Sequence, residues 1–252
     1  MTAQQLNVDT IAHNLANANT VGFKQRRTQF QDLLYQSLIQ PGSAAGAQTF
    51  VPTGLQVGLG TRPASNEIIF TQGNFQQTGN PLDVVIQGRG FFQIRRPNGE
   101  IAYSRAGNFH LNRDGNMVTG DGDPVEPQIT LPPEVQAISI AQDGTVSFAQ
   151  PGQNAAQVAG QIQLANFVNP AGLNSIGRNL FLPTDASGEP VVGVPGGQEG
   201  LGSLQQGYVE ASNVSVVEEF INLILSQRAY EANSKVVKAA DEMYQQVNQL
   251  TR

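Results

Sequence analysis

The chain has 252 residues, enough to bury a sizeable hydrophobic core, and its lack of cysteine excludes a disulfide framework, a thiolate metal site and a cysteine nucleophile. Its 14 basic and 20 acidic residues give a net charge of −6, and there is no tryptophan, so we expect no nucleic-acid partner, which needs a basic surface with stacking aromatics. Because no apolar run approaches the about 18 residues of a membrane span, and no basic segment followed by an apolar one opens the chain, we expect neither membrane insertion nor a cleavable signal peptide.

The first segment of the chain is predicted to be a helix from about Thr2 to Asn19. Gly22 stands where a left-handed residue would end such a helix. Its apolar residues recur at helical spacing and form a stripe of Val8, Ile11, Leu15 and Ala18.

Residues 24–42 carry a basic cluster and a second helical signal. The cluster contains Lys24, Arg26 and Arg27, and we expect it to be a solvated turn. Thr28 and the glutamine three residues later match a capping box, which predicts a helix from Thr28 to a stop at Pro41-Gly42.

The middle of the chain has the pattern of an antiparallel β domain. Short apolar stretches are separated by Asn-Gly and Asp-Gly pairs, which tolerate the positive φ of tight hairpin turns. Strands are expected at residues 84–86, 91–94, 101–104, 109–111, 135–140, 145–148 and 158–167. Residues 183–203 are rich in glycine and proline, and a long exposed loop is expected there.

The last segment is predicted to be a long helix that begins after Ser215. Ser215 and Glu218 match a capping box, and about 35 residues at about 1.5 Å each give roughly 50 Å. Arg228 is the one polar member of a stripe with helical spacing, which otherwise consists of Ile221, Leu225, Ala232, Val236, Ala239, Met243, Val247 and Leu250.

These elements predict an α+β fold in which the two ends of the chain come together. Residues 1–34 and 212–252 are expected to form a discontinuous, coiled-coil-like domain of terminal helices. Residues 35–75 form an extended connecting segment, and residues 76–211 form a central antiparallel all-β domain.

The two apolar stripes predict self-association into a homo-oligomer. The N-terminal stripe is too short to cover a partner helix of roughly 50 Å, so other copies are expected to cover the rest. The chain is also rich in amides, with 29 glutamines and 20 asparagines, and interface cores are depleted in charge. The alternative is a monomer in which both helices pack on the β domain.

No residues are predicted to be catalytic, to bind a cofactor or to hold a metal. His13 and His110 belong to different kinds of element, and no nucleophile elbow, zinc-binding histidine pair or phosphate loop is present. Four carboxylates, Asp83, Glu100, Asp143 and Glu210, leave a glycan hydrolase open as an alternative, together with a monomeric secreted binding module.

Three blocks of sequence resemble the rod and hook proteins of the bacterial flagellum. The first is residues 12–24, with Asn14, Leu15, Ala16, Asn17, Gly22, Phe23 and Lys24; His13 stands where an asparagine is usual. The second is residues 87–92, Gln-Gly-Arg-Gly-Phe-Phe. The third is residues 207–214, continued at residues 227–235 with Gln227, Arg228, Tyr230 and Glu231, and at residues 241–243.

One further segment is similar to the distal-rod members of this family. Residues 35–61, with Tyr35, Gln40, Pro41, Gly42, Pro52, Gly54 and Leu55, resemble a stretch that distal-rod subunits carry and hook subunits lack. Proximal-rod and hook subunits are the alternatives within the family. Family members carry further residues ahead of the position of Met1, and we expect core packing and export to need them.

The resemblance implies a structural subunit without cofactors, assembled into a rigid helical tube in the periplasm. It implies terminal helices that line the core, a segment at 35–75 that locks and stiffens neighbours, and a β domain that faces outward. It also implies passage through the export apparatus of the flagellum, and contacts with proximal rod, hook and ring proteins.

Overall fold

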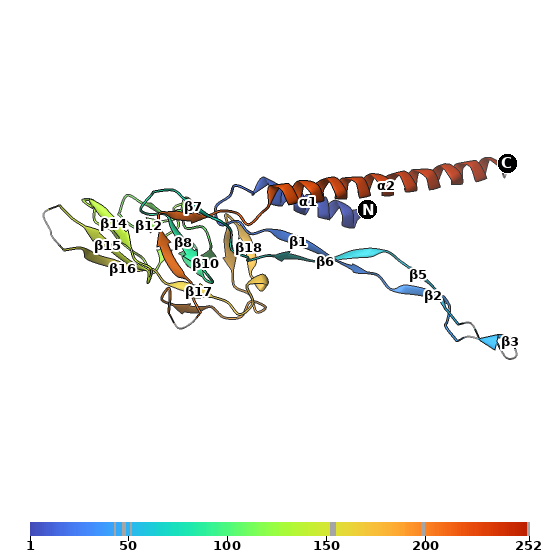
Figure 1. Cartoon of the computed structure of the whole chain (residues 1–252), viewed down its shortest axis with the longest axis horizontal. Helices are drawn as coiled ribbons and strands as arrows, with labels where there is room; N and C mark the ends of the chain where they lie inside the picture. The colour runs from blue at the N-terminus through green and yellow to red at the C-terminus, as the bar shows by residue number, and fades with distance from the viewer. Residues whose placement is uncertain (43, 47–48, 51, 152–154, 198–199, 251–252) are drawn as a thin grey trace. The chain divides into compact units, whose positions relative to one another are not determined.

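The computed structural model describes residues 1–42, 44–46, 49–50, 52–151, 155–197 and 200–250. The chain divides into two compact units. The terminal unit contains residues 1–15, 26–67 and 216–252, and the β unit contains residues 16–25 and 68–215. Helices and antiparallel strands are both present (Figure 1), so the predicted α+β class is confirmed.

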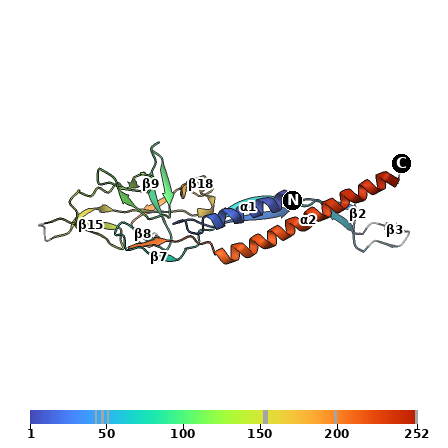
Figure 2. The same ribbon diagram turned by 90° about the horizontal axis from the view of Figure 1, so that it is seen from above.

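Two helices form part of the terminal unit. The C-terminal helix α2 (Val216–Leu250) begins directly after Ser215, as predicted, and has 35 residues. The N-terminal helix α1 (Thr2–Ala16) ends before the predicted Asn19, because residues 17–20 form a turn in which Thr20 N donates to the Asn17 carbonyl oxygen at 3.1 Å. Figures 1 and 2 both show α1 beside the N-terminal part of α2.

The rest of the terminal unit is made of paired strands. β1 pairs with β6, β2 pairs with β5, and β3 pairs with β4, always as two-stranded ribbons. The bounds are β1 (Arg26–Asp32), β2 (Tyr35–Ile39), β3 (Ala44–Gly46), β4 (Thr49–Phe50), β5 (Leu55–Gly58) and β6 (Thr61–Ile68).

The helix predicted from Thr28 to residue 40 is therefore wrong. The register of the ribbon places Tyr35 opposite Gly58 and Gln36 opposite Val57, so backbone groups that a helix would satisfy locally are paired with a later segment. Thr28 does not cap a helix; its hydroxyl lies 2.8 Å from that of Thr10 in α1. The capping-box pattern depends on residues close together in the sequence. The strand pairing that overrides it comes from a segment farther along the chain.

The β unit is built on one large antiparallel sheet. Its strand order is β18-β19-β10-β9-β17-β20, with β13 also paired to β9. The bounds are β9 (Phe91–Arg95), β10 (Ile101–Ser104), β13 (Val125–Glu126), β17 (Leu164–Asn166), β18 (Asn174–Gly177), β19 (Leu180–Leu182) and β20 (Val191–Gly193).

Smaller sheets and one 3-10 turn complete the β unit. β14, β15 and β16 form a three-stranded sheet, and β21–β8, β22–β7 and β11–β12 are two-stranded. The bounds are β7 (Phe75–Gln77), β8 (Val84–Gln87), β11 (His110–Leu111), β12 (Met117–Val118), β14 (Ala137–Ile140), β15 (Thr145–Ala149), β16 (Gln157–Gln161), η1 (Pro170–Gly172), β21 (Ser203–Gln206) and β22 (Tyr208–Glu210).

Most of the predicted strands are present, and the predicted turns explain their pairing. Gly99, Gly115 and Gly144 all have positive φ and join β9 to β10, β11 to β12 and β14 to β15. Only the predicted strand at 158–167 is split, because β16 pairs with β15 whereas β17 pairs with β9.

The expected exposed loop at 183–203 is partly wrong. It contains β20, whose Val192 lies opposite Ala165 of β17. Ser187 and Leu201 within it are buried, and Leu201 belongs to the main core. The glycines and prolines therefore mark turns around an edge strand.

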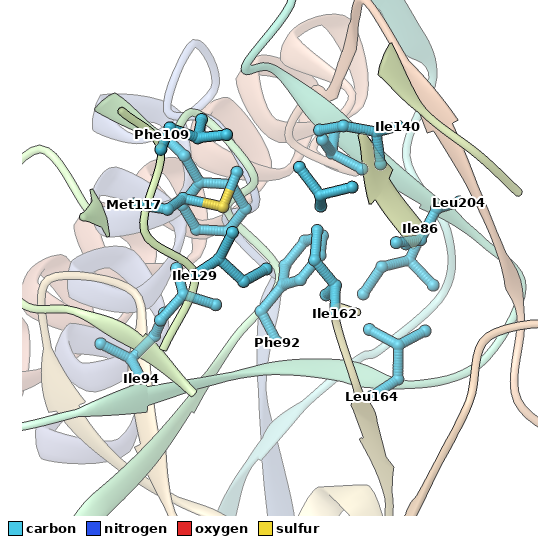
Figure 3. Close-up of a cluster of buried hydrophobic side chains, with 14 of the residues drawn as sticks. Ile86, Phe92, Ile94, Phe109, Met117, Ile129, Ile140, Ile162, Leu164 and Leu204 are labelled. Carbon is cyan, nitrogen blue, oxygen red and sulfur yellow. The ribbon is translucent and has the colours of Figure 1, made fainter. Parts of the chain in front are cut away.

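The large sheet is buried on both faces. Phe92 and Ile94 of β9 enter the main apolar core (Figure 3), whereas Phe91 packs on the opposite face with Phe167 and Phe181. This two-sided burial explains why two adjacent residues of β9, Phe91 and Phe92, are both buried although their side chains point to opposite faces of the sheet. The labelled side chains of Figure 3 converge from several strands and loops on one apolar core: Ile86, Phe92, Ile94, Phe109, Met117, Ile129, Ile140, Ile162, Leu164 and Leu204.

Candidate assembly interface

Asn14 connects three elements inside the terminal unit. Its side chain is 1% exposed, and its amide group makes two hydrogen bonds with the backbone of Arg26 in β1, donating to the carbonyl oxygen at 2.8 Å and accepting from the amide at 2.9 Å. The same amide nitrogen donates to the Glu219 carboxylate of α2 at 3.1 Å. One family-motif asparagine thus sets the position of α1 against both β1 and α2.

Other contacts between α1 and its neighbours are also polar. Asn7 donates to the Ser226 hydroxyl at 3.0 Å, and Gln4 donates to the Ser226 carbonyl oxygen at 3.2 Å. Glu219 and Ser226 are buried on the side of α2 that carries these contacts. The inner surface of the terminal unit is therefore rich in amides and hydroxyls, which accounts for part of the amide-rich composition.

The apolar stripe predicted on α2 lies on the outside of the terminal unit. Val236 is 68% exposed and Met243 is 61% exposed. Burial of these apolar side chains would be favourable, so their exposure leaves free energy to be gained by a contact with another surface. Ala232 and Ala239 are exposed as well, and the Leu250 side chain lies outside the described residues. The other large members of the stripe are also more than half exposed: Ile221, Leu225 and Val247.

The stripe predicted at the N-terminus is placed differently. Ile11 is buried within the chain, and Val8 and Leu15 are half-buried. Ala18 follows the end of α1 and belongs to the β unit. The buried face of α1 is formed instead by Ala3, Thr10, Ile11 and Asn14.

An open groove of about 560 Å³ runs between α1 and α2. Three members of the C-terminal family motif line it, namely Gln227, Tyr230 and Glu231, and they face Val8 and other α1 residues. Arg228, the fourth member, is exposed on α2.

The β2–β5 ribbon exposes apolar side chains in the segment similar to distal-rod subunits. Tyr35 is 57% exposed and Leu55 is 51% exposed. Gln40, Pro41 and Gly42 follow β2 and are exposed, and Pro52 and Gly54 precede β5. The backbone at Gly54 approaches the end of β2 closely, because a Cβ on Gly54 would lie 2.6 Å from the Ile39 carbonyl oxygen.

The β unit contains a buried ion cluster that the sequence did not predict. Lys24 Nζ lies 2.6 Å from Glu210 Oε1, and Arg105 Nε lies 3.6 Å from Glu210 Oε2. Burial lowers the pKa of Lys24, while the adjacent Glu210 carboxylate opposes that shift. The expectation that Lys24 lies in a solvated turn is therefore wrong, because the Lys24 ammonium is buried against the carboxylate of Glu210, which lies far away in the sequence. Arg26 is partly exposed and Arg27 is exposed.

The rest of the N-terminal motif brings Lys24 to this cluster. Gly22 N donates to the Glu210 carbonyl oxygen at 2.8 Å, its φ is 70°, and a Cβ there would lie 2.5 Å from the amide nitrogen of Ala106. Only glycine fits this conformation and this close approach. Phe23 is buried, Asn17 accepts from the Thr20 hydroxyl at 3.2 Å, and Ala16 is the last residue of α1.

The groups considered for catalysis are dispersed. Glu210 is engaged in the ion cluster, and hydrogen bonds from the Thr145 backbone and hydroxyl lower the pKa of Asp143 in an exposed turn. Asp83 accepts from Asn80, and Glu100 pairs with Arg96 at the surface. Among the described residues, no three acidic or histidine side chains are grouped as metal ligands would be, and no helix is long and apolar enough to cross a membrane.

The sequence did not indicate a structural role for three residues, Arg105, Glu219 and Ser226. Each is polar and buried, and each acts through a partner far away in the chain. A polar residue whose partner is more than a hundred residues distant leaves no periodic signal. The family motifs were the only available pointer, since Asn14 and Lys24 both lie within the first of them.

Three family models match the chain. "Flagella basal body rod protein" matches residues 1–24, "Flagellar hook protein FlgE/F/G D1 domain" matches residues 85–148, and "Flagellar basal body rod FlgEFG protein C-terminal" matches residues 205–250. The matched segments contain Asn14, Lys24, Arg105 and Glu210, the residues that organise the two units.

Individual relatives agree over almost the full length. A flagellar basal-body rod protein FlgG from Caulobacter vibrioides is 51% identical over 99% of this chain and 95% of its own. FlgG proteins from Buchnera aphidicola and Borreliella burgdorferi are 48% and 46% identical, over 98% and 100% of this chain and 95% and 96% of their own. Identity at this level over nearly the whole chain shows that it belongs to the family of the flagellar basal-body rod protein FlgG.

Proposed function

We propose that this chain is a structural subunit of the distal rod of the bacterial flagellum. Copies pack side by side into a rigid helical tube that transmits torque from the motor to the hook. The subunit has no catalytic role. A chain with long terminal helices suits a rigid rod, because many modest contacts between long helices resist bending and twisting better than a single flexible contact would.

The observation that carries this proposal is the inverted packing of the terminal unit. Polar groups such as Asn14, Glu219 and Ser226 face inward, whereas the apolar stripe around Val236 and Met243 faces outward. An apolar strip along a helix of 35 residues marks a protein interface rather than a solvated surface. Second copies of the same chain are the natural cover, since the family assembles a rod.

We propose the following arrangement in the polymer. Residues 1–34 with 212–252 line the core, residues 35–75 lock neighbouring subunits, and residues 76–211 face outward. The rod lies in the periplasm, its subunits pass through the flagellar export apparatus, and it meets proximal rod, hook and ring proteins. The family membership and the exposed apolar surfaces of α2 and the β2–β5 ribbon support this arrangement.

Val236→Asp tests the proposed seam. Because Val236 is exposed in the single chain, an aspartate there leaves both units folded. In the polymer the same carboxylate would be buried without a partner, which costs several kcal/mol at each subunit contact. We expect no filaments from this variant by electron microscopy and sedimentation, at concentrations where the unmodified chain assembles.

Gln245→Asp is the matched control, since it adds the same charge to the exposed opposite face of α2. It is expected to polymerise. Filaments from Val236→Asp that match those of the unmodified chain would refute the seam.

Deletion within residues 35–61 tests the locking segment. Removal of β2 through β5 takes away the exposed apolar ribbon, so neighbouring subunits lose the contacts proposed to keep the tube straight. Bent or hook-like polymers are expected by electron microscopy. Straight polymers of unchanged rigidity would show that the ribbon does not stiffen the rod.

A further inference from the structure

A pocket of about 210 Å³ in the β unit lies beside the buried ion cluster. Its apolar walls come from Phe70, Phe91 and Phe167. Its polar lining comes from Arg89, Arg105 and Asn166. The guanidinium carbon of Arg105 stands 5.7 Å from the centre of the Phe91 ring, so one cation is held between an aromatic face and the ion cluster.

The charges in and around this pocket do not balance. Lys24 and Arg105 are two buried cations, and Glu210 is the only described acidic side chain that pairs with either. Arg105 donates from Nη2 to the Gly88 carbonyl oxygen at 2.7 Å, but its Nη1 is buried and has no hydrogen-bond partner among the described residues. Glu210 Oε2 is also buried without a hydrogen bond, and it lies 3.6 Å from Arg105 Nε. A buried donor without a partner next to surplus positive charge favours an incoming anion.

Two further donors fit the same ligand. Arg89 is exposed at the pocket and forms no ion pair with any described residue. The Asn166 side-chain oxygen accepts from the Phe167 amide at 2.9 Å, which leaves its amide nitrogen to face a ligand. Two guanidinium groups between aromatic walls suit a carboxylate on a short apolar stem, because arginine pairs with carboxylates in a bidentate geometry.

Val168 indicates that the ligand belongs to a protein. This residue also lines the pocket and is 88% exposed, more than any other large hydrophobic residue that is described. A small free anion would leave it in water, whereas a protein surface would cover it. The middle of the chain supplies suitable surfaces, since residues 41–211 contain 13 acidic and seven basic residues.

We propose that this pocket binds an aspartate or glutamate side chain from a second copy of the chain. The proposal rests on the proposed function, because only a polymer holds the outer β units of two copies together. The pocket would then fix how neighbouring β units meet, independently of the helix seam.

A titration of the unassembled chain tests the chemistry of the pocket. N-acetylglutamate N-methylamide, which carries the glutamate side chain alone, is added while the side-chain Nε–H signals of Arg89 and Arg105 are followed by nuclear magnetic resonance. We expect a saturable shift of both signals, and none with the uncharged glutamine analogue. Equal responses to the two analogues, or no response, would overturn the carboxylate site.

Assembly tests whether the occupant is a second copy. Arg89→Gln keeps the fold because Arg89 is exposed, and it is expected to raise the concentration needed for polymerisation about tenfold. Arg113→Gln, an exposed arginine outside the pocket, is the control and is expected to change nothing. An unchanged polymerisation threshold for Arg89→Gln would overturn the second-copy occupant, even if the glutamate analogue binds.

A photo-crosslinking residue at position 168 identifies the neighbour. In polymers, we expect crosslinks between copies to a segment that contains an acidic residue; crosslinks confined to one copy would contradict the proposal. If the unmodified chain never polymerises, the proposed function itself fails. The titration still reports on the pocket in that case, because it uses the unassembled chain.

Discussion

Replacement of Glu210 by glutamine is expected to destabilise the β unit by about 3–5 kcal/mol, the usual effect of removing one partner from a buried ion pair. Glu210 Oε1 accepts from Lys24 Nζ at 2.6 Å and from the Gly73 amide at 2.9 Å, and both side chains of the ion pair are fully buried. Glutamine retains an acceptor for one of these donors. It removes the only described negative charge that balances Lys24 and Arg105.

The size of the effect follows from the burial of the whole cluster. A hydrogen bond to a charged group contributes about 1.5–3 kcal/mol, and two of them meet at Oε1. Water cannot solvate the two cations that remain, since Lys24 and Arg105 are only 2% and 5% exposed. In a domain of this size each kcal/mol shifts the unfolding midpoint by about 2–4 °C, so we expect a decrease of roughly 10 °C.

Near-ultraviolet circular dichroism measures the unfolding midpoint of the β unit, because it reports on packed tyrosines such as Tyr103. Thermal unfolding is followed at concentrations below the polymerisation threshold. Glu100→Gln is the control: the Arg96–Glu100 pair spans 3.1 Å, but the glutamate is 58% exposed, and such pairs contribute at most about 1 kcal/mol. If Glu210→Gln unfolds within about 1 kcal/mol of the unmodified chain, the cluster does not hold the unit together.

Two other variants test the interior of the units. Asn14→Ala removes one hydrogen bond to the Glu219 carboxylate and two to the Arg26 backbone, so α1 should lose about 2–3 kcal/mol of protection in amide hydrogen exchange. Gln5→Ala, exposed on the same helix, should lose little; equal protection in both variants would contradict the role of Asn14. Burial raises the pKa of Tyr103 above its ordinary 10.0, so the unfolded chain releases the phenolic proton first and the β unit loses stability as the pH rises past 10. Tyr103→Phe should reduce that loss in urea unfolding at about pH 11 relative to pH 9, and because both chains contain Lys24 its titration cancels; an identical alkaline loss in the two chains would refute the burial effect.

Local sequence was sufficient where the signal is periodic. The stripe at α2 and its capping box predicted a helix that begins after Ser215 and runs for 35 residues. The Asn-Gly and Asp-Gly pairs predicted the hairpins at Gly99, Gly115 and Gly144. These features depend on neighbours within one turn or one hairpin, so the chain itself carries all the information they need.

Local sequence failed where a distant partner decides the structure. Thr28 and its capping-box pattern predicted a helix, yet β1 and β2 are strands, because segments about twenty to forty residues later provide their hydrogen bonds. Lys24 read as a solvated charge, yet Glu210 and Arg105 bury it. In both cases the pairing energy comes from residues that no local window contains.

The sequence by itself determined the family, the α+β class, the long C-terminal helix and the apolar stripe along it. Only the tertiary structure decided that this stripe is left outside while Asn14, Glu219 and Ser226 are turned inward, and that a surplus of buried positive charge adjoins an aromatic pocket. Periodicity shows that a helix has two faces, but the contacts of the folded chain determine which face is buried. That choice makes the exposed stripe available to other copies.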